Sequence, residues 1–203
     1  MLILGITGGV ATGKSTVTQM LGDLGAAVVS ADQIGRDLLA PGSNLTHVVA
    51  RAFADCVMPD AAKVTIDRRA LGKLVFSDSQ ARERLEGILH PPIVAELTRQ
   101  VAALRRQSVP PAAAVEIPLL FEAGLQELVD SILVVTCDEK LQLERLQKRS
   151  IGHAEALQHI AAQMTLAAKE ALADHVITTN STLDDTRAQV YKTWKAVANP
   201  RSR

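Results

Sequence analysis

The sequence predicts an α/β protein built on a parallel sheet of five strands. Short apolar segments alternate along the chain with longer amphipathic segments, the pattern typical of strands joined by helices. The first, third and fourth apolar segments are largely uninterrupted, as in strands buried on both faces. The predicted strands are Leu2–Thr7, Ala27–Ser30, Ala113–Ile117, Ser131–Thr136 and His175–Thr178.

Helices are expected between these strands. One should begin near Lys14 and run toward Leu24, and the stretch 33–109 is too long for a simple crossover. Helical periodicity within that stretch predicts a helical insertion between the second and third strands. Pro91-Pro92 is expected to break a helix and so present His90 to a cleft, although a lone histidine is more often structural or exposed. Further helices are predicted over Asp138–Arg149, Ala154–Met164 and Thr182–Val197.

The composition argues against several classes of partner. Lys plus Arg and Asp plus Glu are 22 each in 203 residues, so the net charge offers no general attraction to nucleic acid or to an anionic membrane. Aromatic residues make up only 2%, which weakens a base-stacking interpretation. No apolar run approaches the roughly 18 residues of a membrane span. We therefore expect a cytoplasmic protein with no nucleic-acid or membrane partner.

The strongest motif is Gly8–Ser15, which fits the phosphate-binding pattern Gly-x-x-x-x-Gly-Lys-Ser/Thr. It lies between an apolar strand and an amphipathic helix, where backbone N–H groups and the helix N-terminus attract phosphate. Lys14 is suited to reach the β- and γ-phosphates, and the Ser15 hydroxyl to ligate Mg²⁺. The predicted ATP-binding residues are Gly9, Val10, Ala11, Thr12, Gly13, Lys14, Ser15 and Thr16.

Four further residues are candidates, and two interpretations are open for Asp32 and for the two arginines. Asp32 follows the second strand, where it would either accept a proton from an attacking hydroxyl or cap a helix that begins at Gln33. Glu116 ends the third strand, where a carboxylate would orient magnesium-bound water. Arg145 and Arg149 are spaced i,i+4 on one predicted helix face, which fits either a solvated face or a lid that neutralises transferring phosphate.

Several shorter motifs follow the phosphate loop in a fixed order. They are Ala31-Asp32 with Arg36, Asp67–Gly72, Val75-Phe76, Leu89-His90-Pro91, Glu116–Glu122, Ala161–Met164, Lys169 and Ala173–Ile177. Together with Gly5–Gly9 and Gly13–Thr16, these motifs extend from Ile3 to about Val190 and resemble the dephospho-coenzyme A kinase family. That family carries out the last step of coenzyme A biosynthesis. Glu116–Glu122 is the most specific of these motifs, because other P-loop kinases lack it.

The resemblance implies the three-layer P-loop kinase fold, with a five-stranded parallel sheet, a helical substrate-binding insertion and a helical lid. The nucleotide-binding core is expected at 1–32, 110–137 and 166–203, the acceptor-binding insertion at 33–109, and the lid at 138–165. The implied reaction transfers the γ-phosphoryl group of ATP to the ribose 3′-hydroxyl of dephospho-CoA, with Mg²⁺ as cofactor. A monomer or small homo-oligomer is expected.

The resemblance also implies roles for individual residues. Asp32 matches the catalytic base, while Lys14, Arg145 and Arg149 would neutralise the charge of the transferring group. The implied acceptor-binding residues are Asp32, Arg36, His90 and Leu120.

The sequence departs from the family pattern at a few positions. Ser30 replaces the first Asp of the family's Asp-Ala-Asp pattern, and a changed magnesium or hydrogen-bonding contact is expected there. Ala11 stands where glycine is common, and is expected to need an ordinary backbone angle. Residues 178–181 lack the usual Asn-x-Gly turn, so no adenine contact is assigned to them.

Two alternatives remain open at this point. A kinase of the same fold acting on a nucleoside monophosphate or another small acceptor is one, against which Pro118-Leu119-Leu120 and His90-Pro91 argue. The second is a P-loop nucleotide switch or ATPase. Such proteins carry a hydrophobic strand that ends in Asp, whereas the third strand here ends with Val115–Pro118.

Overall fold

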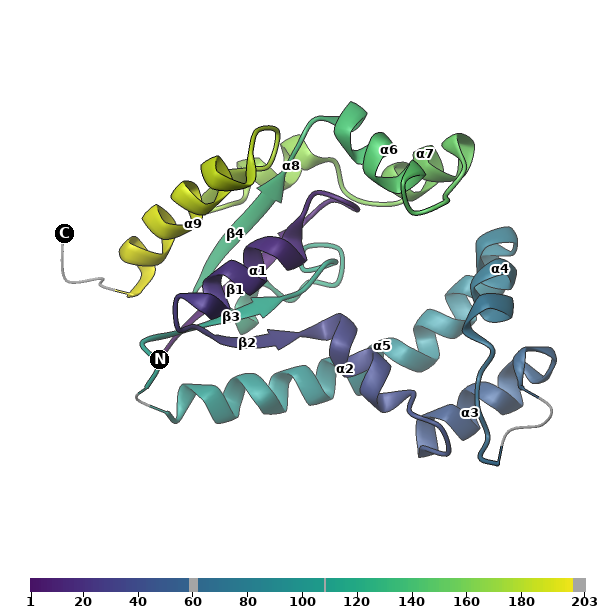
Figure 1. Cartoon of the computed structure of the whole chain (residues 1–203). Coiled ribbons are helices and arrows are strands. Elements are labelled where there is room, and N and C mark those ends of the chain that lie inside the picture. Colours follow the sequence, from purple (N-terminus) through teal and green to yellow (C-terminus); the bar gives the residue numbers. More distant parts are fainter. Residues whose placement is uncertain (59–61, 108, 199–203) are drawn as a thin grey trace. The chain divides into compact units, whose positions relative to one another are not determined.

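Five parallel strands form a sheet in the order β2-β3-β1-β4-β5 (Figure 1). The central strand, β1, pairs on one side with β3 and on the other with β4, so the loop after β1 emerges from the middle of the sheet. The predicted five-stranded parallel sheet is confirmed. The strands are β1 Leu2–Gly8, β2 Ala27–Ser30, β3 Ala112–Glu116, β4 Ser131–Thr136 and β5 His175–Thr178.

The computed structural model describes residues 1–58, 62–107 and 109–198, and the chain divides into two compact units. The first unit comprises residues 1–30 and the described part of 100–203, and contains the whole sheet. The second unit comprises 31–99.

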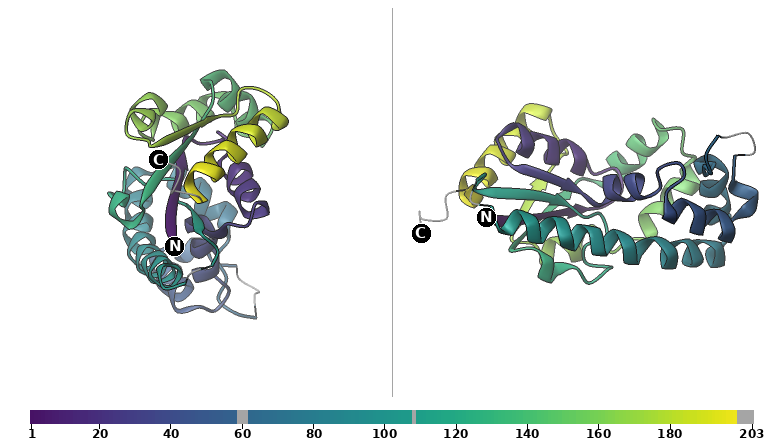
Figure 2. Two further views of the ribbon diagram at one scale, coloured as in Figure 1. Left: turned by 90° about the vertical axis from the view of Figure 1, so that its left-hand side faces the viewer. Right: turned by 90° about the horizontal axis from the view of Figure 1, so that it is seen from below.

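The core of the first unit explains its strand sequences. β3 is buried at all five positions, because helices cover both of its faces. Alternate residues of β1 and β4 pack against the apolar sides of α1 (Lys14–Asp23) and α9 (Leu183–Ala198), which run along the sheet in Figure 2. The buried residues of this cluster include Leu4, Ile6, Val17, Leu21, Leu133, Val135 and Val190.

Three short helices lie between β4 and β5 in the sequence. They are α6 Glu139–Gln147, α7 His153–Ala161 and α8 Leu166–Ala171. The prediction of one helix through Arg149 is wrong in its last turn: α6 ends at Gln147, and Arg149 lies exposed in the turn that follows. Ser150 has a left-handed backbone angle (φ 64°), which is incompatible with helix continuation. Arg145 and Arg149 therefore do not share one helix face.

The second unit is helical and has its own apolar core. Its helices are α2 Ala31–Leu38, α3 Asn44–Ala52, α4 Arg68–Ser77 and the part of α5 (Ser79–Arg105) that precedes Gln100. Side chains of Ser43 and Asp67 accept backbone N–H bonds at the starts of α3 and α4, which fixes where these helices begin. The core is centred on Val49, Phe53, Cys56, Ile66 and Leu71.

The predicted helix break at Pro91-Pro92 is wrong, because α5 continues through both prolines. Each proline removes one backbone donor, which leaves the carbonyls of Gly87 and Ile88 without their usual helix partners. Gly87 is exposed, so water is available to its carbonyl.

Among the described residues, no helix is long and apolar enough to cross a membrane.

Candidate functional site

The loop between β1 and α1 has the backbone of a phosphate-binding loop. Gly8 and Gly13 have positive φ angles of 149° and 94°, and Gly13 caps the N-terminus of α1. Ala11 also has a positive φ, of 58°, so the expectation of an ordinary backbone angle there is wrong. An L-residue in this region costs about 1–2 kcal/mol, and Ala11 is therefore held by its surroundings.

Close approaches explain why two loop positions have no side chain. A Cβ on Gly8 would lie 2.1 Å from the carbonyl oxygen of Val135 on the neighbouring strand. A Cβ on Gly9 would lie 2.7 Å from Nε2 of Gln142. Glycine therefore lets β4 and α6 contact the loop directly.

Lys14 folds back over the loop. Its Nζ donates to the carbonyl oxygen of Gly9 at 2.6 Å and to that of Gly8 at 3.3 Å. The ammonium group thus lies at the start of the loop, where it is available to bound phosphate oxygens.

Ser15 and Glu116 bring two oxygen ligands together at the carboxyl edge of the sheet. The Ser15 hydroxyl donates to Oε1 of Glu116 at 2.9 Å, and Glu116 is 5% exposed. A hydroxyl and a carboxylate are hard oxygen donors of the type Mg²⁺ prefers, and Mg²⁺ commonly takes only one or two protein ligands beside phosphates and water. The pair therefore fits this ion. Ser30 is the β2 partner of Glu116 in the sheet.

Arg145 joins the loop to the segment after β5. Its Nη1 donates to the carbonyl oxygen of Ala11 (3.1 Å) and to the hydroxyl of Thr179 (2.9 Å), and its Nη2 to the carbonyl of Thr179 (3.0 Å). The Thr179 hydroxyl in turn donates to the carbonyl of Thr12 at 2.7 Å. Of the two predicted arginines, the structure brings Arg145 to the phosphate loop.

Two glutamines contact the tip of the loop, and sequence reasoning assigned them no role. Gln142 of α6 donates from Nε2 to the carbonyl of Val10 at 2.7 Å, and Gln163 accepts the Val10 N–H at 2.9 Å. Gln163 was visible within the Ala161–Met164 motif. Nothing in the sequence predicted a contact for Gln142, because a neutral polar residue in a largely charged helix is usually exposed to solvent.

Lys169 and Glu122 form an ion pair beneath the loop. Lys169 is fully buried, and its Nζ lies 2.8 Å from Oε1 of Glu122 and within 3.5 Å of the carbonyls of Gly8 and Pro118. Burial alone would raise the pKa of Glu122. Hydrogen bonds from Lys169 and from backbone N–H groups, including that of Met164, outweigh burial and lower it.

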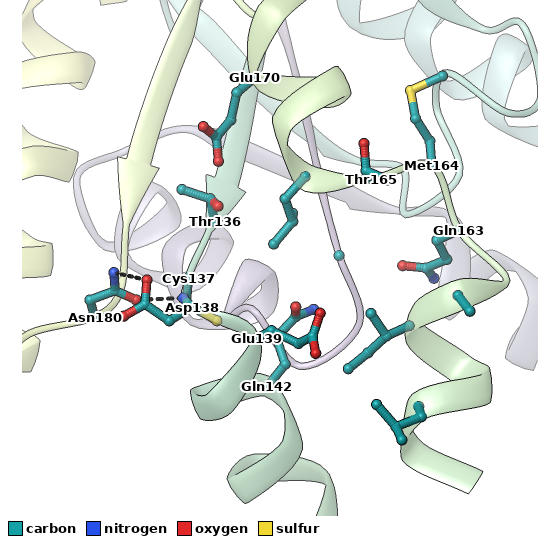
Figure 3. A pocket seen from close by; sticks show the side chains of 15 residues that line it. Thr136, Cys137, Asp138, Glu139, Gln142, Gln163, Met164, Thr165, Glu170 and Asn180 are labelled. Atoms are coloured by element: carbon teal, nitrogen blue, oxygen red, sulfur yellow. Dashed lines mark hydrogen bonds between the residues drawn. The ribbon is translucent and has the colours of Figure 1, made fainter. Parts of the chain in front are cut away.

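A cavity of about 880 Å³ opens beside the loop in the first unit (Figure 3). Asp138 and Asn180 form one wall, joined by two hydrogen bonds of 2.7 and 2.9 Å. Cys137 also lines it; burial raises the pKa of this thiol, although the nearby Arg145 guanidinium opposes the shift. The lining includes Gly9 of the phosphate loop and three carboxylates, of Asp138, Glu139 and Glu170.

A separate hollow of about 380 Å³ lies within the second unit. Asp32, Arg36 and Arg68 line it together with apolar side chains, and Arg68 donates to the backbone carbonyl of Arg36 at 3.4 Å. α2 begins at Ala31, so Asp32 lies in its first turn, and the predicted helix start at Gln33 with Asp32 as the cap is wrong. His90, an exposed residue of α5, is not among the residues that line this hollow.

Leu120 lies in the core of the first unit. It is fully buried, and its Cδ1 would be 3.1 Å from a Cβ on Gly5. Its side chain packs against β1 at Gly5.

The five-stranded parallel sheet and the lysine-containing loop after β1 define a P-loop nucleotide-binding protein. A family model described as dephospho-CoA kinase matches residues 2–185. The chain belongs to the dephospho-CoA kinase family. A Geobacter metallireducens protein named dephospho-CoA kinase is 44% identical over 197 residues, which cover 96% of each chain.

Solved structures agree with this assignment. A crystal structure of a Thermus thermophilus protein is 30% identical and superposes with a TM-score of 0.79, covering 96% of each chain. The dephospho-CoA kinase from Campylobacter jejuni is 27% identical, with a TM-score of 0.74 and 98% of each chain covered.

Proposed function

We infer that this chain transfers the γ-phosphoryl group of ATP to the ribose 3′-hydroxyl of dephospho-CoA, giving CoA and ADP. The observation that carries the inference is the phosphate loop with Lys14 above it and the Ser15–Glu116 pair beside it, in a chain of the dephospho-CoA kinase family. ATP is the co-substrate of such kinases. The cytoplasmic location and the monomeric or small homo-oligomeric state stay predictions.

The first unit supplies the groups that bind the nucleotide. Residues Gly9–Thr16 would bind the ATP phosphates through backbone N–H groups, with the Lys14 ammonium at the β- and γ-phosphates. Ser15 would ligate Mg²⁺ directly and Glu116 through water. Bound Mg²⁺ supplies charge neutralisation on the β- and γ-phosphate oxygens.

Neutralisation of phosphate charge and alignment of the reacting groups would account for most of the reduction in the activation barrier, because the transition state of phosphoryl transfer is loose. Arg145 would add its charge from the base of the lid, 138–165. It is anchored on the loop carbonyl of Ala11, which supports a fixed position beside the phosphates. Arg149 is exposed and would contribute only through closure of the lid.

The acceptor would bind through the helical insertion, 33–109, with Asp32 as the base that takes the proton of the 3′-hydroxyl. Asp32 lies two residues beyond β2, and in open parallel sheets ligands bind outside the carboxyl ends of the strands. The hollow that Asp32 shares with Arg36 and Arg68 supports this role, since a carboxylate and two guanidiniums suit a hydroxyl and a pyrophosphate. His90 and Leu120 stay predicted acceptor contacts.

Competition between acceptors tests the substrate. The protein is incubated with ATP, Mg²⁺ and an equimolar mixture of dephospho-CoA, AMP, CMP and shikimate, and products are identified by mass. The inference predicts that CoA forms at least about a hundredfold faster than any other product, since a site that hydrogen-bonds its substrate discriminates by such factors. A nucleoside diphosphate as the main product would overturn it.

Asp32→Asn tests the proposed base in the same assay, with Asp37→Asn on the exposed face of α2 as the matched control. Loss of about 10²–10⁴ in kcat is expected for Asp32→Asn and little change for the control. If Asp32→Asn stays fully active, the acceptor can still be correct, but the role of Asp32 is not.

A further inference from the structure

The tip of the phosphate loop is held by side chains from residues 138–165. Gln142 donates to the Val10 carbonyl at 2.7 Å, and Gln163 accepts the Val10 N–H at 2.9 Å. Both polar backbone groups of Val10 are therefore bonded to glutamine side chains. Figure 3 shows the two side chains beside the loop, Gln142 on α6 and Gln163 beyond the end of α7.

These bonds fix the backbone on both sides of the left-handed residue in the loop. The Val10 carbonyl bonded by Gln142 belongs to the peptide plane before Ala11, and the Ala11 carbonyl bonded by Arg145 belongs to the plane after it. Because an alanine at φ 58° is intrinsically disfavoured, the loop needs such external bonds to keep this conformation.

The packing around Gln142 matches this role. Its side chain is only 2% exposed, so an unbonded amide there would leave polar atoms buried. Gly9 leaves the space it occupies, since a Cβ on Gly9 would lie 2.7 Å from its Nε2.

We propose that Gln142 and Gln163 are positioning residues, which preorganise the phosphate loop for nucleotide binding by fixing the two peptide planes that contain the backbone groups of Val10. A phosphate-binding loop acts through the direction of its N–H groups, so a loop whose peptide planes are not fixed must be ordered when nucleotide binds. The proposal rests on the inference that this loop binds ATP, but not on the identity of the acceptor.

The test measures binding of ADP with Mg²⁺ by titration calorimetry in the absence of acceptor. Gln142→Met and Gln163→Met keep side-chain length and remove the hydrogen bond. Each should weaken ADP binding about five- to tenfold, the effect of one hydrogen bond, and leave KM for dephospho-CoA unchanged. Gln147→Met, an exposed residue of α6, is the matched control and should bind ADP like the wild type.

A pair of charged variants tests the direction of each bond. Gln163→Glu keeps an oxygen that accepts the Val10 N–H, whereas Gln142→Glu sets a carboxylate against the Val10 carbonyl. Both add one negative charge beside the same residue. Gln163→Glu should therefore retain more ADP affinity than Gln142→Glu by about tenfold or more.

Two outcomes would overturn the proposal. One is wild-type ADP affinity in Met variants that keep the wild-type circular dichroism spectrum. The other is an equal loss in the two Glu variants, which would show that charge alone acts. A wild-type protein that binds ADP but forms no CoA would defeat the proposed function and leave this test intact.

Discussion

Replacing Gly8 with Ala should destabilise the first unit strongly. The new Cβ would lie 2.1 Å from the carbonyl oxygen of Val135, and real Cβ atoms essentially never come closer than 3.0 Å. Gly8 and Val135 are register partners in β1 and β4, two paired strands of the sheet, so neither backbone can move away alone. Overpacking of this kind costs about 1–3 kcal/mol, and φ 149° adds about 1–3 kcal/mol for alanine. We expect a loss of about 3–5 kcal/mol.

Urea unfolding followed by the fluorescence of Trp194 measures this loss, because the only tryptophan packs against the core of the same unit. Gly25→Ala is the matched control. Gly25 also has a positive φ, 98°, but a Cβ at this position would meet no heavy atom within 4 Å beyond its chain neighbours, so only the backbone cost of about 1–2 kcal/mol applies. Equal losses in the two variants would refute the claim that the close approach to β4 requires Gly8.

Three further predictions concern polar side chains around the loop. Lys169→Met should lower the free energy of unfolding by about 1–3 kcal/mol in urea titrations, because the partly buried Glu122 carboxylate loses its ion-pair partner. An unchanged midpoint would contradict this. The pKa of Glu122 is lowered from 4.5, so the ionised carboxylate stabilises the folded state above that value, and this stabilisation disappears as the pH falls through the lower folded pKa. The wild type should therefore lose more stability than Glu122→Gln between about pH 5 and pH 3. Parallel plots of unfolding free energy against pH for the two proteins would contradict this. Ser15→Ala should raise the Mg²⁺ concentration needed for half-maximal rate at least about tenfold, and an unshifted Mg²⁺ titration would exclude Ser15 as a ligand.

Much of the sheet followed from residue patterns alone. Ala27–Ser30, Ser131–Thr136 and His175–Thr178 coincide with β2, β4 and β5, because apolar segments bounded by polar or turn residues leave little choice of ends. The phosphate loop was equally predictable, since its pattern carries a backbone geometry as well as residue types.

Prediction failed at two places where the observed backbone departs from the preference of the residue itself. Ala11 adopts φ 58° although alanine disfavours it, because Gln142 and Arg145 bond the carbonyls on either side. α5 continues through Pro91 and Pro92 although proline usually ends a helix. The partners that bond the loop around Ala11 lie in α6, so no pattern confined to the loop contains them.

The side-chain contacts of the site were the least predictable part. Ser15 meets Glu116 across 101 positions of sequence, and Val10 meets Gln163 across 153. Motifs place such residues near the same sheet edge, but only the packed structure shows which side chain bonds to which backbone group.

Formation of CoA tests the central claim most directly. Purified protein is incubated with ATP, Mg²⁺ and dephospho-CoA, and the products are identified by mass, with Lys14→Ala alongside the wild type. We expect CoA and ADP in equal amounts from the wild type, and a rate at least about a hundredfold lower from Lys14→Ala, which lacks the ammonium group above the loop. ADP without CoA, or equal CoA from both proteins, would contradict the account.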